Sequence, residues 1–356
     1  MNSRIIRLRE KMKTESLDAF LITSFENYRY FSGFSGSNCA LIITKNQAFA
    51  FTDGRYTVQI KNQAKGFESI IIERTMPEHI AELLDNIEAS SVGYETHNVT
   101  DFFISKIKAL ASSSEFVPCP DFGKEIRMVK DESEIALMRR AAEISDNSFL
   151  ALCTKITKGM TEREAAATLE YEMAKRKSTA PAFNTIAASE IRGSMPHAEA
   201  EDIEIPDNCL MTFDFGATVD GYKSDITRTI HIGKPQKDLE DLFDIVFEVQ
   251  QKCLSEVRSG KEARALDALA HALFAEHGVD KYFTHALGHG VGLAIHEEPT
   301  LSRRSGTVLE KGMIVTIEPG LYVEGLGGVR IEDSVVVTDG GCEVLTHAPH
   351  RINISL

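Results

Sequence analysis

The sequence predicts a mixed α/β protein of the α+β type, with a small N-terminal α/β domain and a larger C-terminal domain that contains an internal duplication. Three observations predict this fold. The 356 residues exceed the usual size of a single hydrophobic core. The first third of the chain alternates short helical patterns with short apolar runs. The remainder repeats one order of elements twice, namely two helices followed by a β-hairpin.

The apolar runs of the first third are separated by turn-like segments, which is typical of a small α/β domain. Segment 117–123 carries two prolines and a glycine and suits a linker. We therefore expect an N-terminal domain over residues 1–123 and a C-terminal domain over residues 124–356. The expected strands of the first domain are 17–23, 39–44, 48–52, 69–73 and 91–94.

The C-terminal domain is expected to consist of two similar halves. Capping boxes and apolar periodicity predict its helices, and Asp220-Gly221 is a strong hairpin signal. Two such halves would form a curved antiparallel sheet with helices on its outer face and a concave inner face with a near-twofold axis. Ligand sites favour such a hollow. Helices are expected from about residues 132, 161, 238 and 259, and hairpins at 209–232 and 313–337.

The first hairpin places two acids on one face. A turn at residues 219 and 220 would set Asp214 opposite Asp225, whereas a turn at Asp220-Gly221 would set Asp214 opposite Thr227. Side chains alternate along a strand, so both registers leave the two acids on the same face. Two facing carboxylates repel each other, and we expect a cation between them.

The second hairpin repeats the arrangement. Its symmetric register sets Glu318 opposite Glu332, and both acids interrupt otherwise apolar strands. The period of two also puts Tyr322 on the face of Glu318 and Arg330 on that of Glu332. A phenol and a guanidinium should therefore border the same hollow.

Three histidines, His285, His289 and His296, lie in a stretch whose glycines make a regular helix costly, which favours a loop or an irregular strand. Four carboxylates and at least one imidazole at one concavity suit a pair of divalent ions better than a structural zinc. Such a pair supports hydrolysis. Amide, ester and phosphoester substrates all remain open on this argument.

Composition excludes several classes of partner. The net charge of −14 repels nucleic acid. The six cysteines form no C-x-x-C pair, which fits reduced thiols. The charged N-terminus is unlike a signal peptide, and no apolar run approaches membrane-spanning length. We expect a cytoplasmic protein that binds no membrane.

The metal-site motifs resemble those of a known family. Asp214 is followed by Asp225, His289 lies within His-Ala-Leu-Gly-His-Gly-Val-Gly, Glu318 precedes Pro-Gly, and Glu332 lies within Val-Arg-Ile-Glu-Asp. Together these motifs resemble the metallopeptidases with the pita-bread fold. The Xaa-Pro peptidases, prolidase and aminopeptidase P, are most similar. The resemblance covers essentially the whole chain, including a creatinase-like N-terminal domain.

The resemblance implies a dinuclear centre. Asp214 and Asp225 would bind one ion, His289 and Glu318 the other, and Asp225 and Glu332 would bridge both. It also implies a bridging hydroxide as nucleophile and Mn²⁺ as the ion, with Co²⁺, Zn²⁺ and Fe²⁺ as alternatives.

It further implies roles for residues around the ions. Glu318 matches the proton-shuttling acid of the family, and His285 and His296 match catalytic histidines that contact the substrate carbonyl or the leaving proline. The substrate-side or supporting positions are matched by His197, Tyr322 and Arg330.

Two positions depart from the family pattern. Relatives usually have glycine where Glu190 and Ala198 stand, on either side of the loop that leads to His197. This puts the substrate pocket in doubt rather than the metal site. The remaining histidines in this domain match nothing catalytic and are expected to be structural or exposed: His231, His271, His277, His347 and His350.

We therefore expect a homodimeric metallo-exopeptidase that cleaves between an N-terminal residue and proline, in Xaa-Pro dipeptides or in short peptides with proline second. The choice between dipeptidase and aminopeptidase stays open. Alternatives are a methionine aminopeptidase-like enzyme, a metal-free creatinase-type hydrolase and a catalytically silent binding module. The separate N-terminal domain opposes the first, and five intact ligands oppose the other two.

Overall fold

The computed structural model describes residues 3–120 and 122–356. The chain divides into two compact units, Met1–Arg127 and Met128–Leu356. The segment expected to be a linker is partly regular structure, because strand β6 (Glu115–Pro118) and helix α6 (Phe122–Met128) occupy its two ends. The domain boundary after residue 123 stays a prediction.

The N-terminal unit is built on a six-stranded mixed sheet in the order β4-β3-β2-β1-β5-β6. All five strands expected in this unit are present, and β6 is an additional one. Apolar residues from strands and helices form its core, for example Ile42 and Phe51 with Ile80 and Leu84. The strands are β1 (Ala19–Ile22), β2 (Ala40–Thr44), β3 (Ala48–Thr52), β4 (Glu68–Ile71) and β5 (Ser91–Tyr94), and the main helices are α1 (Ser3–Thr14), α2 (Phe25–Ser32), α3 (Thr57–Gln63), α4 (Met76–Asn86) and α5 (Asp101–Leu110).

The first half of the C-terminal unit begins with two capped helices. Asp131 and Thr161 each accept a hydrogen bond from the backbone N–H of a glutamate three residues later, which confirms both capping boxes. The helices are α7 (Glu132–Cys153) and α8 (Glu162–Lys175). They are followed by β7 (Ile186–Ser189), the 3₁₀ helix η2 (Glu190–Ser194), β8 (Cys209–Phe215), β9 (Thr218–Val219), β10 (Tyr222–Lys223) and β11 (Ile226–Ile232).

The second half repeats this order with helices α9 (Lys237–Glu256) and α10 (Ala263–Glu276) and the 3₁₀ helix η3 (Asp280–Tyr282). Its strands are β12 (Gly288–Gly290), β13 (Glu297–Leu301), β14 (Ile314–Ile317), β15 (Gly320–Val323), β16 (Gly327–Arg330), β17 (Asp333–Val337), β18 (Cys342–Val344) and β19 (Asn353–Ile354). Each long strand expected in the second hairpin is broken in two, and the breaks fall at Glu318 and at Glu332.

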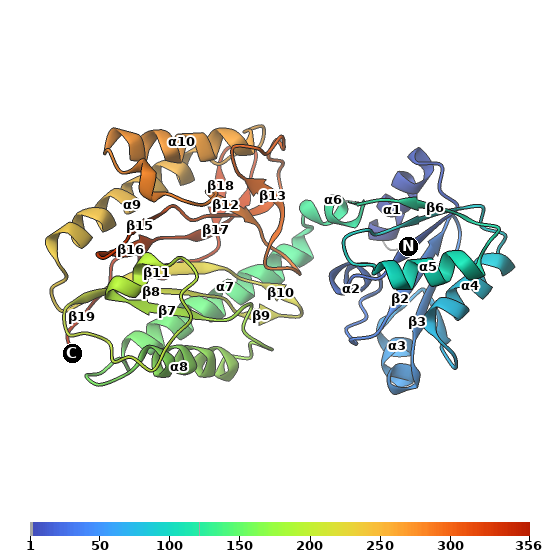
Figure 1. The fold of residues 1–356 in the computed structure, drawn as a ribbon, viewed down its shortest axis with the longest axis horizontal. Helices are drawn as coiled ribbons and strands as arrows, with labels where there is room; N and C mark the ends of the chain where they lie inside the picture. Colours follow the sequence, from blue (N-terminus) through green and yellow to red (C-terminus); the bar gives the residue numbers. More distant parts are fainter. Residues whose placement is uncertain (1–2, 121) are drawn as a thin grey trace. The chain divides into compact units, whose positions relative to one another are not determined.

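The strands of this unit have the mainly antiparallel arrangement that we expected, divided among several sheets. They form two larger sheets, β19-β11-β8-β7 and β13-β12-β14-β17-β18, and two short ribbons. Every pairing is antiparallel except that of β11 with β19. In Figure 1 helices α7 and α8 lie on one side of the strands, and α9 and α10 lie on the opposite side.

Each half has its own hydrophobic core. In the first, Phe149 of α7 and Leu169 of α8 pack with Met211, Phe213 and Phe215 of β8. Residues 212 and 214 alternate with these apolar residues, so they point away from the helices. In the second core, residues of α9 and α10 pack in the same way against β14 and β17. The strand faces that carry the acids are therefore left free to meet.

Both hairpins adopt registers that the sequence had predicted. Asp214 pairs with Thr227, which is the register of a turn at Asp220-Gly221. Asp220 and Gly221 both have positive φ, 46° and 81°, as a type I′ turn requires. In the second hairpin Ile317 pairs with Asp333, and Gly320 pairs with Arg330. Both pairs belong to the symmetric register, which is confirmed.

One histidine that lies apart from the group of acids is buried without a polar partner among the described residues. His231 of β11 is 2% exposed and packs edge-on against Phe243 of α9. Neither ring nitrogen has a hydrogen-bond partner within the described part of the chain. Burial, and then the charge of Arg351, lower its pKa from 6.5, although Glu240 and Asp244 oppose the shift. The folded protein therefore holds this imidazole neutral.

We expect this burial to reduce stability in acid. Below pH 6.5 the unfolded chain gains a proton at His231 that the folded chain does not bind, so stability falls by up to about 1.4 kcal/mol per pH unit for this group. Denaturant unfolding between pH 5 and 8 measures the slope. His231→Phe should flatten it, whereas His347→Gln, at an exposed histidine, should not. An unchanged slope in His231→Phe would contradict this account.

The described residues include no helix with the length and apolar character needed to cross a membrane.

Candidate metal centre

Five predicted ligands are presented by strand ends that face one another. Asp214 lies on β8 and Asp225 immediately precedes β11. Glu318 lies between β14 and β15, Glu332 lies between β16 and β17, and His289 is in the middle of β12. The histidine stretch thus contains only a three-residue strand around His289, and His285 and His296 lie in irregular segments, in agreement with the expected loop or irregular strand. A backbone hydrogen bond from Glu332 N–H to the Thr227 carbonyl, 3.2 Å long, joins the two hairpins at this point.

The structure brings the donor atoms of these residues together. His289 Nε2 lies 3.3 Å from Glu318 Oε1 and 3.6 Å from Asp225 Oδ2. One ligand atom each from Asp225, His289 and Glu332 lie within 4.8 Å of one another. These separations suit oxygen and nitrogen ligands around a divalent ion.

The acids of the cluster carry more negative charge than the described residues neutralise. Burial, and then repulsion by Glu332 and Asp214, raise the pKa of Asp225 well above its usual range. Burial and the neighbouring Glu318 raise the pKa of Glu332 in the same way. Asp214 Oδ1 is buried without a hydrogen-bond partner among the described residues. A divalent cation would remove the repulsion and satisfy this oxygen, so the residues fit a metal site.

His289 is oriented as a metal ligand should be. Its Nδ1 is 3.0 Å from the Gly290 carbonyl, which favours a proton on Nδ1 and leaves the Nε2 lone pair directed at the acids. Burial lowers its pKa and so favours the neutral form. The flanking glycines are required by crowding, since a Cβ at Gly288 would lie 2.0 Å from the Thr316 carbonyl oxygen.

Two threonines, which the sequence reasoning missed, hold carboxylates in place. Thr227 Oγ1 donates to Glu332 Oε2 at 2.7 Å, and Thr316 Oγ1 donates to Glu318 Oε1 at 3.1 Å. Both threonines stand two residues from a predicted ligand, at 225 and 318, and therefore share its face. This two-residue spacing from a predicted ligand is the sequence signal by which the two threonines could have been found.

Arg330 and Tyr322 support the centre from one side. Arg330 is buried; its Nη2 lies 2.7 Å from Asp214 Oδ2 and its Nη1 donates to the Tyr322 hydroxyl at 2.8 Å. His285 Nε2 lies 2.9 Å from the same hydroxyl. Burial raises the pKa of Tyr322 to about 12, so this phenol stays protonated. Through these contacts His285, Tyr322 and Arg330 hold the Asp214 carboxylate in position.

The other two predicted histidines lie nearby. The ring of His296 is 4.4 Å from that of His289, centroid to centroid, and burial followed by the charge of His289 lowers its pKa. His197 is exposed, yet its charge also contributes to lowering the pKa of His285 and of His296. All ten predicted site residues therefore belong to one neighbourhood.

A second polar group, also missed from the sequence, lies behind the ligands. Arg228 and Asp333 are fully buried and form an ion pair at 2.7 Å. Nε of Arg228 also donates to the Ala348 carbonyl at 2.8 Å, and His350 Nε2 lies 2.8 Å from Asp333 Oδ2. His350 is thus structural, as expected. The pair connects the first hairpin to the strand that follows Glu332.

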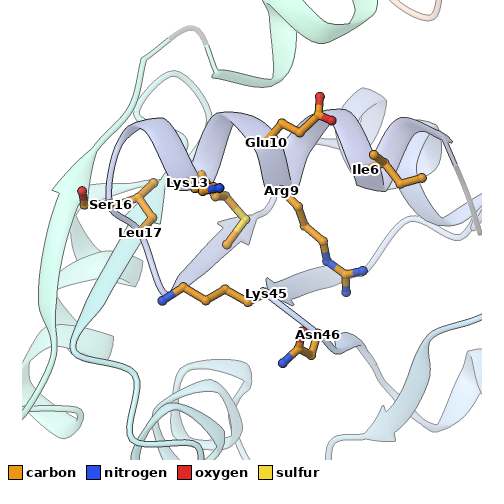
Figure 2. Close-up of a pocket in the computed structure, with 9 residues that line it drawn as sticks. Ile6, Arg9, Glu10, Lys13, Ser16, Leu17, Lys45 and Asn46 are labelled. Carbon is orange, nitrogen blue, oxygen red and sulfur yellow. The ribbon is translucent and has the colours of Figure 1, made fainter.

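A pocket of about 770 Å³ on the N-terminal unit is unrelated to this centre. Figure 2 shows it beside helix α1, with Arg9, Lys13 and Lys45 among its lining residues. It contains none of the predicted site residues.

Comparison with known proteins agrees with this geometry. Residues 136–339 match metallopeptidase family M24, and residues 4–129 match the creatinase/prolidase N-terminal domain. The chain is 37% identical to a protein named Xaa-Pro dipeptidase from Pyrococcus horikoshii, over 99% of both chains. A structure of an Xaa-Pro dipeptidase from Bacillus anthracis superposes with a TM-score of 0.96 at 37% identity, over 99% of both chains. A structure of an X-Pro aminopeptidase from Thermotoga maritima gives 0.90 at 36% identity, over 97% of this chain and 100% of the other. This chain therefore belongs to metallopeptidase family M24 and carries a creatinase/prolidase N-terminal domain.

Proposed function

We propose that this protein is a metal-dependent exopeptidase that hydrolyses the bond between an N-terminal residue and proline. One observation carries the metal-dependent hydrolysis: four acids from two hairpins converge with His289 of β12 and leave negative charge uncompensated. The names of the relatives support the preference for proline. Both a dipeptidase and an aminopeptidase stand among them, so the length of the substrate is left to experiment.

We propose two divalent ions, with Mn²⁺ preferred over Co²⁺, Zn²⁺ and Fe²⁺ because oxygen donors dominate the cluster. Asp214 and Asp225 would hold one ion, His289 and Glu318 the other, and Asp225 and Glu332 would contact both. When bound, the ions activate water as a nucleophile and stabilise negative charge that develops on the substrate oxygen.

Glu318 is proposed to move the proton. Burial raises its pKa, although His285 opposes the shift, so this carboxyl can accept a proton from the attacking water and release it to the leaving nitrogen. Thr316 fixes one of its oxygens. Rotation of the whole side chain is therefore restricted during the transfer.

The histidines are proposed to act on the substrate side. His296 has no hydrogen-bond partner among the described residues, so its ring can donate to a substrate carbonyl as charge develops there. His285 is bound to the Ala286 carbonyl and to the Tyr322 hydroxyl. We place His285 on the same substrate-facing side of the metal centre as His296, and we propose that Tyr322 and Arg330 orient the substrate there.

We also propose that the protein works as a homodimer in the cytoplasm. All six cysteines are free, which supports a reducing compartment. The family resemblance supports the dimer, and sedimentation equilibrium tests it.

The activity test uses the purified protein loaded with Mn²⁺. Ala-Pro, Ala-Pro-Ala, Ala-Ala and Met-Ala-Ala are incubated separately, and the released N-terminal amino acid is measured. At least one proline peptide should be cleaved roughly 100-fold faster than Ala-Ala, and EDTA should abolish cleavage. Metal binding without turnover of any peptide would instead support a binding module. Preferential cleavage after an N-terminal methionine would support a methionine aminopeptidase-like enzyme.

A further inference from the structure

The segment Ser189–Glu201, called here the His197 loop, borders the candidate metal centre. The Pro196 carbonyl accepts a hydrogen bond from Arg330 Nη1 at 3.2 Å, and Arg330 pairs with Asp214. The next residue is His197. Any displacement of this loop would therefore move a substrate-side histidine, while Arg330 keeps its own ion pair with Asp214.

The loop starts in an unfavourable backbone conformation. Glu190 has φ of 51°, in the left-handed region, which costs about 1 kcal/mol or more for a residue with a side chain. This is the position at which glycine was expected, and the glycine-like backbone is retained without glycine. The loop also touches β16 backbone to backbone, since a Cβ at Gly328 would lie 2.0 Å from the Gly193 carbonyl oxygen. Such a conformation persists only when neighbouring groups hold it.

Glu162 holds the His197 loop in this conformation through four hydrogen bonds. It is the first residue of α8 and is fully buried. Oε1 of Glu162 accepts from the Ser189 backbone N–H at 2.7 Å and from the Ser189 hydroxyl at 2.8 Å. Its Oε2 accepts from Arg192 Nε at 3.0 Å and from the Glu201 N–H at 3.3 Å. One carboxylate thus fixes the beginning, the middle and the end of the loop.

Arg192 extends the restraint to the far side of the loop. Its Nη1 donates to Glu201 Oε1 at 2.7 Å, and its Nη2 donates to the Glu199 carbonyl. Glu162 stands in the first turn of α8, where an exposed acid would interact equally well with the helix dipole, so the dipole does not explain its burial. A buried carboxylate is costly unless it is paired and hydrogen-bonded, so the four loop contacts are what make this burial tolerable.

We propose that Glu162 and Arg192 are positioning residues that fix the His197 loop against the metal centre and thereby set the affinity for the peptide. They do not touch the metal ligands. This inference rests on the proposed peptidase function for its kinetic consequence, while the restraint on the loop can be measured without any substrate.

The test compares Glu162→Gln with wild type and with Glu172→Gln. Glu172 is also a buried glutamate of α8, paired with Lys155 and Arg176 away from the loop, so it matches the loss of a buried ion pair. In Glu162→Gln the KM for the cleaved proline peptide should rise about tenfold while kcat changes by less than about threefold. Mn²⁺ affinity measured by calorimetry should be unchanged. Arg192→Gln should reproduce this pattern, and Glu172→Gln should lower Tm without changing KM.

Amide hydrogen exchange gives the readout that needs no activity. Residues 190–200 should exchange faster in Glu162→Gln than in wild type or in Glu172→Gln. Equal exchange in all three proteins, or equal KM in both variants, would overturn the proposal. If wild type cleaves no proline peptide, the proposed function fails, and the exchange experiment still decides whether Glu162 restrains the loop.

Discussion

Asp225→Ala is expected to lower kcat/KM for the cleaved Xaa-Pro peptide by about 10³-fold or more, because an ion that loses a shared ligand no longer supplies several kcal/mol of charge stabilisation. Asp225 lies 3.6 Å from His289 and shares one group of donor atoms with His289 and Glu332. Peptide cleavage and Mn²⁺ binding by calorimetry measure the two losses.

The same substitution should not destabilise the metal-free protein. Asp225 is buried beside acids that repel it, so its removal relieves repulsion and offsets the small cavity that it leaves. The Tm of the metal-free variant should therefore equal or exceed that of the metal-free wild type. Asp339→Ala, at an exposed acid paired with Lys311, is the control and should retain full activity. A fully active Asp225→Ala would refute the assigned centre.

Arg228→Met is expected to cost about 3–5 kcal/mol of stability, because it leaves the Asp333 carboxylate buried without its cation. Burial alone would raise the pKa of Asp333, but Arg228, followed by His350, outweighs burial and holds it at about 2. The carboxylate is therefore charged in the folded state and depends on its partner. Urea unfolding of the metal-free protein measures the loss.

The control is Arg139→Met. Arg139 pairs with Glu343 at the same distance of 2.7 Å, but both side chains are more than 40% exposed. Solvent screens such a pair, so its loss should cost no more than about 1 kcal/mol. Arg228→Met/Asp333→Leu should recover part of the stability by removing both charges. Equal losses in the two arginine variants would show that burial does not govern the strength of this pair.

Much of the candidate site could be predicted because strands have a period of two. The alternation of Phe213, Asp214 and Phe215 placed an acid opposite the helices whichever register the hairpin adopted. The glutamates of the second hairpin followed the same rule. The capping boxes at Asp131 and Thr161 likewise located two helices from residues three apart. These signals depend only on residues close together in the sequence, so tertiary packing does not change them.

The sheet arrangement was harder to predict. A curved antiparallel sheet was expected and the pairing is mainly antiparallel, but the ladder is interrupted at Glu318 and Glu332 and the strands are divided among several sheets. Alternation fixes the face of a side chain, but it does not tell where a strand interrupts its hydrogen bonding. At these two breaks Glu318 and Glu332 stand between strands rather than within the ladder.

The family, the two-half plan of the C-terminal domain and the faces of the acids could be read from the amino-acid sequence, because each follows from short-range periodicity or from residues within one motif. The polar groups that hold those acids in place became visible only in the folded chain. Arg228 meets Asp333 across 105 positions of sequence, and Glu162 meets the His197 loop across 27 or more. No local pattern encodes such pairs, since burial of both partners arises only when separate elements pack together.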